Sequence, residues 1–388
     1  MKKSTRHDLL NPQEAIGTRC GMIVAFRVAF CFLTIILGVC CHVQAQSAQS
    51  GVGQPGTANV TEKAVAVQSH LQVLKSKASP RKERLQALHE TYQARKTLSR
   101  QEQLNFWNEA KTVAMDKTED AQLRADTIWV VGGLGMEFKY EKTMSHEEVV
   151  QQCQFLLQTA ADESENTRVR RISITTLGNL KMKEGVSVVK NLLADKTNHN
   201  RSDIARSACV ALSELAPEEA LQPISEVLTD TTNSAVFGSA AYALGRINNR
   251  DALPVLVANR LRLGDNLSVD NAVEAMSDTV MKVLKKPTDP LIITAIKATR
   301  TLWRDEQKAV WRPLLRAIFV AKDAPIETRR EALHQLHDDA NRLPLEMAQK
   351  QLAELVPLIE KETSFKDELA AIQQVLNAQV LPPEKDSR

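Results

Sequence analysis

Five stretches of the chain repeat one pattern of residue sizes, and this pattern restricts the fold more than any other feature of the sequence. They read LRADTIWVVG, VRRISITTLG, IARSACVALS, VFGSAAYALG and SVDNAVEAMS, starting at residues 123, 169, 204, 236 and 268. The fifth position always holds a small or short residue: Thr127, Ser173, Ala208, Ala240 and Ala272. The apolar ninth residues settle at spacings of 35, 32 and 32 residues: Leu177, Leu212, Leu244 and Met276. Self-similarity at such a period predicts a solenoid.

A second set of helical stretches follows the first at a distance of about a dozen residues. Its members are Glu184–Asp195, Glu219–Asp230 and Asp251–Leu261. Four of the five first stretches carry another small residue at the eighth position: Thr176, Ala211, Ala243 and Ala275. Small residues permit close approach of neighbouring helices, and stacking joins apolar faces that one helix pair cannot bury alone. We therefore expect an all-α fold, a right-handed α-solenoid (superhelix) of stacked helix–turn–helix repeats.

The stretches VRRISITTLGNL and AAYALGRINNRDALPVL resemble the HEAT-repeat family, in particular the short HEAT-like repeats named after phycobilisome lyases. The resemblance covers about residues 120–285. Members of the family often have Arg after the leading Val, as at Arg124 and Arg170. Here the same place is taken in the later stretches by Ala205, Phe237 and Val269. These departures argue against a regular ladder of arginines between the repeats.

The first 45 residues have the three parts of a secretory signal. A basic segment carries Lys2, Lys3, Arg6, Arg19 and Arg27, an apolar run extends from Val28 to Val39, and Val43-Gln44-Ala45 resembles a cleavage site. We expect cleavage and export to the periplasm or the medium. Two alternatives stay open. One is an uncleaved membrane anchor over Gly21–Cys41, which Arg27 interrupts, and the other is lipidation at Cys40, where the large Val39 departs from the usual motif.

The composition of the remaining chain divides it into further regions. Residues 46–60 are small, polar and aperiodic, which is typical of a flexible linker. The best internal break is the Pro-containing run 285–290. The expected regions are a signal peptide (1–45), the linker (46–60), an N-terminal helical cap region (61–119), HEAT-like repeats (120–285), divergent C-terminal helical repeats (286–380) and a disordered tail (381–388).

The net positive charge of the chain comes from its leader, residues 1–45. The whole sequence has 50 Lys and Arg against 47 Asp and Glu, and residues 1–45 hold five of the former and two of the latter. Subtraction leaves 45 of each, so the mature part has no net charge. A neutral protein lacks the global positive field that nucleic-acid binding uses, and only 4% of the residues are aromatic. We expect no nucleic-acid partner, and membrane contact only through an uncleaved leader or a lipid anchor.

No motif in the sequence requires catalysis or a cofactor. The run Val131-Gly132-Gly133-Leu134-Gly135 follows a helical pattern rather than a strand, so we interpret it as a helix terminus and turn rather than a phosphate loop. His334 and His337 lie three residues apart on an expected helix. A metal would need further ligands, so a solvated or capping role is favoured and metal binding stays an open alternative. We name no catalytic, cofactor-binding or metal-binding residue.

The remaining chemical groups have structural interpretations. Cys153 and Cys209, the two cysteines beyond the leader, are expected to be buried free thiols. Acidic residues expected to complement helix starts are Glu163, Glu165, Glu218 and Glu219. Basic residues expected on a solvated face are Arg168, Arg170, Arg171, Lys181 and Lys183. Aromatic residues expected in the core, with one or two as interface anchors, are Trp107, Trp129, Trp303, Trp311, Phe237 and Tyr242.

These observations favour an exported HEAT-repeat scaffold that binds a protein partner through an extended helical surface. The partner and the residues that bind it are not identified by the sequence. Two alternatives come from the resemblance alone: an enzyme like the bilin lyases that attaches a chromophore, and a HEAT-like nucleic-acid-binding module. Neither has an assignable site in this sequence.

Overall fold

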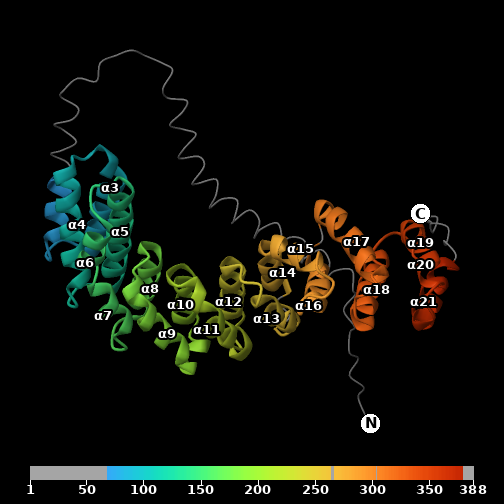
Figure 1. Ribbon diagram of the computed structural model, residues 1–388. Helices are drawn as coiled ribbons and strands as arrows, with labels where there is room; N and C mark the ends of the chain where they lie inside the picture. Colours follow the sequence, from blue (N-terminus) through green and yellow to red (C-terminus); the bar gives the residue numbers. More distant parts are fainter. Residues whose placement is uncertain (1–67, 264–265, 303, 379–388) are drawn as a thin grey trace, which may run out of the picture. The chain divides into compact units, whose positions relative to one another are not determined.

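α-Helices and short 3₁₀ turns make up all the regular structure of the residues described by the computed structural model, which are 68–263, 266–302 and 304–378. The chain divides into two units, Met1–Val65 and Ala66–Arg388. The expected signal peptide, linker and tail, and Trp303, lie outside the described residues. The following description therefore concerns the second unit (Figure 1).

The five repeated stretches lie on five helices. These are α5 (Ala121–Tyr140), α8 (Thr167–Leu180), α10 (Ser202–Leu215), α12 (Ser234–Ile247) and α14 (Asn266–Ala275). The helices that follow them are α6 (His146–Gln152) and α7 (Phe155–Ala161), then α9 (Val186–Ala194), α11 (Pro217–Asp230), α13 (Ala252–Asn259) and α15 (Ser277–Leu284). Short 3₁₀ turns are η2 (Arg95–Thr97), η3 (Lys183–Gly185), η4 (Lys196–Asn200), η5 (Thr299–Thr301) and η6 (Thr363–Phe365).

Further helices flank this series on both sides. A helix at 68–75, α3 (Arg81–Ala94) and α4 (Arg100–Met115) precede it. Those that follow it are α16 (Ile292–Ala298), α17 (Asp305–Val320), α18 (Ile326–Ala340), α19 (Leu345–Ala353), α20 (Val356–Ile359) and α21 (Lys366–Leu376). The predicted break at 285–290 lies between α15 and α16. At the start of α4, Ser99 and Glu102 form a capping box, because each side chain binds the backbone amide of the other residue.

The first helices of successive repeats pack against one another in chain order. Helix α5 packs on α8, α8 on α10, α10 on α12 and α12 on α14, and Figure 1 shows the helices of this unit following one another as a series of pairs. Leu177, Leu212, Leu244 and Met276 are completely buried and belong to one continuous core. The predicted all-α solenoid of stacked helix pairs is confirmed.

Small residues bring the stacked helices within backbone contact. All five residues at the fifth position of the stretches are buried. A Cβ atom added to Gly178 would lie 2.9 Å from the Cα of Ala211, and one added to Gly245 would lie 2.8 Å from the Cα of Ala272. These distances are shorter than a carbon–carbon contact permits. The pattern of small residues therefore sets the distance between neighbouring repeats.

The glycine run at 131–135 was expected to end a helix, and this expectation is wrong. All five residues lie inside α5, which continues to Tyr140. The glycines serve packing instead: a Cβ on Gly132 would meet the Thr176 side chain at 2.6 Å, and one on Gly133 would meet the Tyr92 hydroxyl at 2.4 Å. Absence of a side chain at these positions lets α3 and α8 approach α5, which offsets the low helix propensity of glycine.

The fifth stretch departs from the other four near its end. Helix α14 stops at Ala275, which is exposed rather than buried like the other small residues at the eighth position. Met276 has non-helical dihedral angles and precedes α15 directly. Its side chain is nevertheless completely buried, so the ninth position keeps its place in the core.

Replacing Gly245 with alanine tests the close approach of α12 and α14. In an open helix this change stabilises by about 0.5–1 kcal/mol, because alanine has the higher helix propensity. Here we expect a loss of about 1–3 kcal/mol, because the new methyl group overlaps backbone atoms that cannot rotate away. Urea unfolding measures the change. The control is Gly185→Ala, whose new methyl group would meet only side-chain atoms, those of Leu177 at 3.3 Å and Leu157 at 3.6 Å. Equal stability of both variants would contradict the packing.

Candidate functional site

Four buried arginines cap the ends of helices at the junctions between repeats. Arg84, Arg124, Arg170 and Arg329 are 4–7% exposed. The Nε of each donates a hydrogen bond to a carbonyl ten residues earlier, with acceptors Leu74 (2.9 Å), Ala114 (3.1 Å), Ala160 (3.3 Å) and Phe319 (2.7 Å). We call these residues the arginine ladder. Because the last carbonyls of a helix have no partner within the helix, the ladder satisfies groups that would otherwise be buried without a hydrogen bond.

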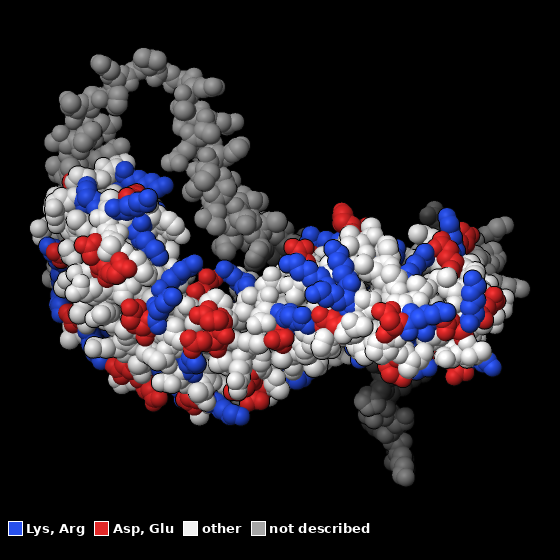
Figure 2. Space-filling view, viewed as in Figure 1, with Lys and Arg blue, Asp and Glu red and all other residues white. Residues whose placement is uncertain are grey.

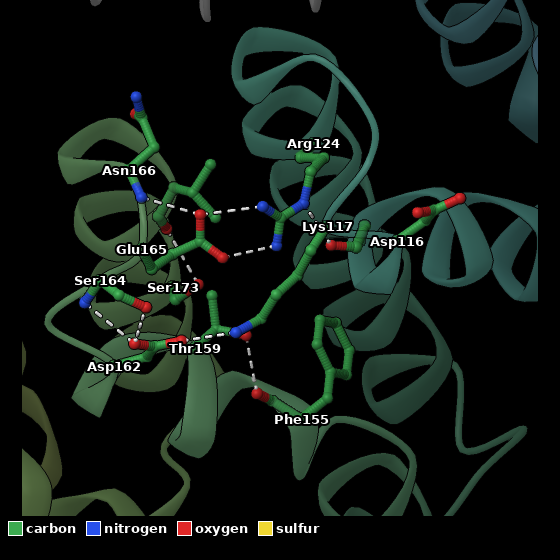
Figure 3. Close-up of polar contacts among 12 residues, drawn as sticks. Asp116, Lys117, Arg124, Phe155, Thr159, Asp162, Ser164, Glu165, Asn166 and Ser173 are labelled. Carbon is green, nitrogen blue, oxygen red and sulfur yellow. Dashed lines mark hydrogen bonds and ion pairs between the residues drawn. The ribbon is translucent and has the colours of Figure 1, made fainter. Parts of the chain in front are cut away.

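Carboxylates on the next interhelical turn hold three of these arginines. Arg124 donates to both oxygens of Glu165 at 2.8 and 2.7 Å, and both side chains are only 5% exposed (Figure 3). Arg84 binds Glu119 in the same bidentate way. In the C-terminal part, Arg329 lies 2.9 Å from Glu362. Each pair joins one repeat to the next, and the bidentate geometry of the Arg84 and Arg124 pairs fixes the orientation of their side chains.

The ladder position holds other residues in α10 and α12, where different side chains supply the donors. At the end of α9, the Asn198 amide and the His199 ring contact the carbonyls of Leu192 and Leu193 at 3.0 and 2.6 Å. At the end of α11, Arg262 donates to the carbonyls of Leu228 and Thr231. Its guanidinium lies 5.4 Å from the ring of Phe237, the residue that stands in the ladder position of α12. The requirement for a donor is therefore met at both junctions without a ladder arginine.

This geometry corrects one sequence interpretation and extends another. Arg170 was expected on a solvated face and is buried, because its guanidinium caps α7. Glu165 was expected at a helix start, where it does accept a hydrogen bond from the Asn166 amide, and it also pairs with the buried Arg124. The argument against a regular ladder holds only for α10, α12 and α14. A local signal was available, since every ladder arginine stands four residues after the N-cap of its helix: Pro80, Asp120, Asn166 and Pro325.

A second set of ion pairs joins successive turns at the surface. The Nζ of Lys77 lies 2.6 Å from Asp116, and that of Lys117 lies 2.6 Å from Asp162 (Figure 3). The hydrogen bond from Lys117, with those from Ser164, lowers the pKa of Asp162 below its usual range. These lysines are largely exposed, so the pairs contribute orientation more than stability.

The exposed face of the first helices carries two large aromatic residues. Trp129 on α5 and Tyr242 on α12 are 50% and 49% exposed. Both occupy the seventh position of the repeated stretches, with Thr175 on α8 and Val210 on α10 between them. Because α5, α8, α10 and α12 pack in this order, the four residues form one row across adjacent helices. We call it the seventh-position row.

Neighbouring side chains hold both aromatic residues in place. Trp129 packs edge-on against Tyr92 with ring centroids 4.9 Å apart, and the Arg95 guanidinium lies 4.1 Å from the Tyr92 ring. At the other end of the row, the Tyr242 hydroxyl accepts a hydrogen bond of 3.2 Å from Arg246. Arg246 also pairs with Glu214 of α10 at 2.5 Å. Immobilised aromatic side chains bind a partner at a low cost in conformational entropy.

The other predicted aromatic and thiol groups are core residues. Trp107, Trp311 and Phe237 are at most 1% exposed. Cys153 and Cys209 are buried free thiols, as expected, and burial raises the pKa of each to about 12. Such thiols do not ionise near neutral pH, so neither is an activated nucleophile.

The histidine pair at the C-terminal end of the solenoid lines a small pocket. His334 and His337 of α18 face Asp367 and Glu368 near the start of α21 in a cavity of about 260 Å³. The Nε2 of His334 lies 3.6 Å from Glu368, which already pairs with Arg330 at 2.9 Å. Across the described ranges, no group of three or more His, Cys, Asp or Glu side chains has an arrangement that suits a metal ion.

Charged side chains of both signs are interspersed over the visible face of the described helices (Figure 2). The cross-repeat pairs account for this arrangement, because a cation of one helix commonly faces an acid of the next. Examples are Arg168 with Asp126 at 3.6 Å and Arg304 with Glu274 at 2.5 Å. Within the described part of the chain, no helix combines the length and the apolar character needed to cross a membrane.

Comparison with known proteins identifies the class of this chain. The HEAT repeats family matches residues 153–232 and 197–277. The chain is therefore an α-solenoid whose central part consists of HEAT repeats. A comparison with curated proteins found no match.

Two solved structures are similar to the chain at low identity. Human deoxyhypusine hydroxylase in complex with glycerol is 13% identical, with a TM-score of 0.31, over 83% of this chain and 99% of that one. The complex of CpcE and CpcF of phycocyanin lyase from Nostoc sp. PCC7120 gives 17% identity and a TM-score of 0.24, over 70% of this chain and 93% of that one.

The pair of Arg124 and Glu165 predicts a specific pH dependence of stability. Burial raises the pKa of Glu165, but the hydrogen bonds from Arg124 and the Asn166 amide outweigh it, so the pKa lies below its ordinary value. A lowered pKa gives stability that is present above the unfolded value, about 4.3, and is lost as the pH falls through the folded value. We expect Glu165→Gln to cost about 1–3 kcal/mol at pH 7, because the buried Arg124 loses its counterion.

The difference in unfolding free energy between wild type and Glu165→Gln should begin to shrink as the pH falls below about 4.3, where the unfolded carboxylate takes up a proton, and should continue to shrink until the pH is below the lowered folded pKa. Urea unfolding at a series of pH values measures it. Glu163→Gln is the matched control, since Glu163 is exposed two residues away. A difference that stays constant from neutral to acidic pH would contradict the role of this pair.

Proposed function

We propose that the protein is an exported, non-catalytic scaffold that binds a protein partner over the seventh-position row. The observation that carries the proposal is the placement of Trp129 and Tyr242, both half exposed, at one register of helices that pack in series. Trp, Tyr and Arg dominate the binding energy of protein interfaces. Tyr242, with Arg246 beside it, stands at one end of the row, and Trp129 stands at the other. Both ends therefore carry residue types that dominate protein interfaces.

The residues between the two aromatic anchors support a protein partner. Thr175 and Val210 are intermediate in exposure, and Ile172 packs partly against the core beside them. The middle of the row is therefore uncharged itself, and Arg171 and Arg206 stand one helical turn away from it. Neighbouring helices pack about 8–10 Å apart, so three steps from α5 to α12 span roughly 27 Å. This length suits a folded surface or an extended segment of about eight residues at about 3.3 Å per residue.

The charge distribution supports recognition by shape rather than by a strong electrostatic field. Several cations near the row already have partners: Arg168 pairs with Asp126, Arg246 pairs with Glu214, and Arg206 donates to the Ser239 hydroxyl. Nucleic-acid binding relies on cations that are free to replace counterions along the phosphate backbone. A protein surface, with apolar and mixed polar groups, matches the row better.

Export and the absence of catalysis are parts of the same proposal. The signal-like sequence of residues 1–45 is the support for export, and N-terminal sequencing of the protein from the envelope or medium tests it. Mixing the purified protein with a bilin and recording the visible absorbance tests the lyase alternative. A stable shift with covalent attachment would replace the scaffold with an enzyme. A salt-sensitive DNA mobility shift would favour the nucleic-acid alternative in the same way.

Site-specific photocrosslinking tests the row as the binding surface. A photoreactive phenylalanine analogue replaces Val210 in the middle of the row or, as a control, the exposed Met115 of α4. After irradiation of cells that export the protein, we expect one discrete protein adduct from position 210 and none of the same mass from position 115. Trp129→Ala and Tyr242→Ala should each reduce that adduct about tenfold or more, because truncating an aromatic anchor costs about 2 kcal/mol of binding.

The same variants should melt within about 2 °C of wild type, because both aromatic side chains are half exposed in the free protein. Adducts that form equally from both positions, or that are insensitive to both truncations, would show that the row is not the binding surface.

A further inference from the structure

A groove of about 600 Å³ opens between α17 and α19, away from the seventh-position row. Helix α17 contributes Lys308, Arg312 and Arg316, which follow one another at intervals of four residues and so share one face of the helix. The opposite wall comes from α19 and the residues that flank it. It is formed by Leu343, Met347, Lys350, Gln351 and Glu354. A row of cations therefore faces a wall that is partly apolar.

The floor of the groove is a fixed polar cluster. Both Nε and Nη2 of Arg312 lie 2.7 Å from the same oxygen of Asp339, which is 5% exposed. Gln351 donates to that oxygen at 3.2 Å. Arg312 is thus committed to a buried carboxylate of α18, and its role is to hold the two walls rather than to bind a ligand.

The cations at the rim are less completely satisfied. Lys308 lies 3.7 Å from Asp305, whose own side chain is fully exposed. Arg316 pairs with Glu354 at 2.6 Å, but its Nε is buried without a hydrogen-bond partner among the described residues. Lys350 makes no hydrogen bond or ion pair with the part of the chain that the structure describes. Near the seventh-position row, by contrast, Arg168 and Arg246 are paired across repeats.

We propose that this groove binds an acidic peptide segment of a partner protein. Lys308 and Lys350 take its carboxylates, and an apolar side chain of the segment packs on Met347, which is 57% exposed, and on Leu343. Charge complementarity is the reason for an acidic occupant, because the four cations of the lining still outnumber its two carboxylates when Asp339, the partner of Arg312, is added to them. The site is separate from the row and extends the scaffold with a second binding surface.

A peptide suits the groove better than a polyphosphate or a nucleic acid does. Asp305 and Glu354 stand in the lining beside the cations and would repel a dense row of phosphates more strongly than the separated carboxylates of a peptide. The apolar side chains Ala309, Leu343 and Met347 would gain nothing from a phosphate backbone. Alternating carboxylate and apolar side chains match both kinds of lining residue at once.

Fluorescence anisotropy with a defined probe tests the assignment. The probe is a fluorescein-labelled peptide of eight residues that alternates glutamate with leucine, titrated with the full chain. We expect saturable binding that weakens as salt is raised. The same peptide with glutamine in place of glutamate should bind at least about tenfold more weakly, since it keeps the apolar side chains and loses the charge.

Variants of the rim lysines locate the binding. The double variant Lys308→Glu, Lys350→Glu should lose about tenfold or more in affinity, whereas Lys350→Arg should retain it, because a cation stays in place. Lys322→Glu is the matched control: Lys322 is exposed on the turn between α17 and α18 and does not line the groove. Melting temperatures of all variants, measured in parallel, separate loss of binding from loss of fold.

Several outcomes would overturn the proposal. These are no binding of the glutamate peptide by the wild type, equal affinity for the glutamine peptide, or wild-type affinity of the double lysine variant. Displacement of the peptide by an equal concentration of inorganic triphosphate would show a general anion site instead. Trp129→Ala should bind the probe like the wild type. A failure of the groove proposal can therefore be distinguished from a failure of the proposal for the seventh-position row.

Discussion

Every junction in this solenoid has to satisfy the last carbonyl groups of a helix that is covered by the next repeat. Water does not reach these groups freely, and an unpaired buried carbonyl costs about 1–3 kcal/mol. The chain meets the requirement in different ways. A ladder arginine serves at four junctions, Asn198 and His199 serve after α9, and Arg262 serves after α11. At these six junctions the fold depends on the presence of a donor and not on its being an arginine.

The regularity of the fold was predictable because its cause is local. Small residues at fixed positions of a helix determine how close a neighbour can come, and the contacts of Gly178 with Ala211 and Gly245 with Ala272 are the direct result. The same reasoning failed at residues 131–135, where glycines were expected to end a helix. Their use is to admit Tyr92 and Thr176 from neighbouring helices, a packing requirement that no property of the run itself indicates.

The candidate binding surface was only partly predictable. Composition and core preference placed Trp107, Trp311 and Phe237 correctly, but Trp129 and Tyr242 are half exposed. Their shared position in the repeat indicates that they are exposed, since the seventh position faces outward on each first helix. Hydrophobicity alone does not indicate it. The groove between α17 and α19 was beyond sequence reasoning, because its walls come from two helices separated by α18 and its lining depends on how their side chains pair.

The donor at the end of α11 has a consequence for how the chain is assembled. Arg262 lies 34 residues beyond Leu228 and 31 beyond Thr231, whereas each ladder arginine lies ten residues beyond its acceptor. During translation, a ladder junction can close almost as soon as its helix has emerged. The end of α11 must wait until α12 and α13 have also become available for folding. The middle of the solenoid is therefore the segment whose nascent form most needs protection from premature association.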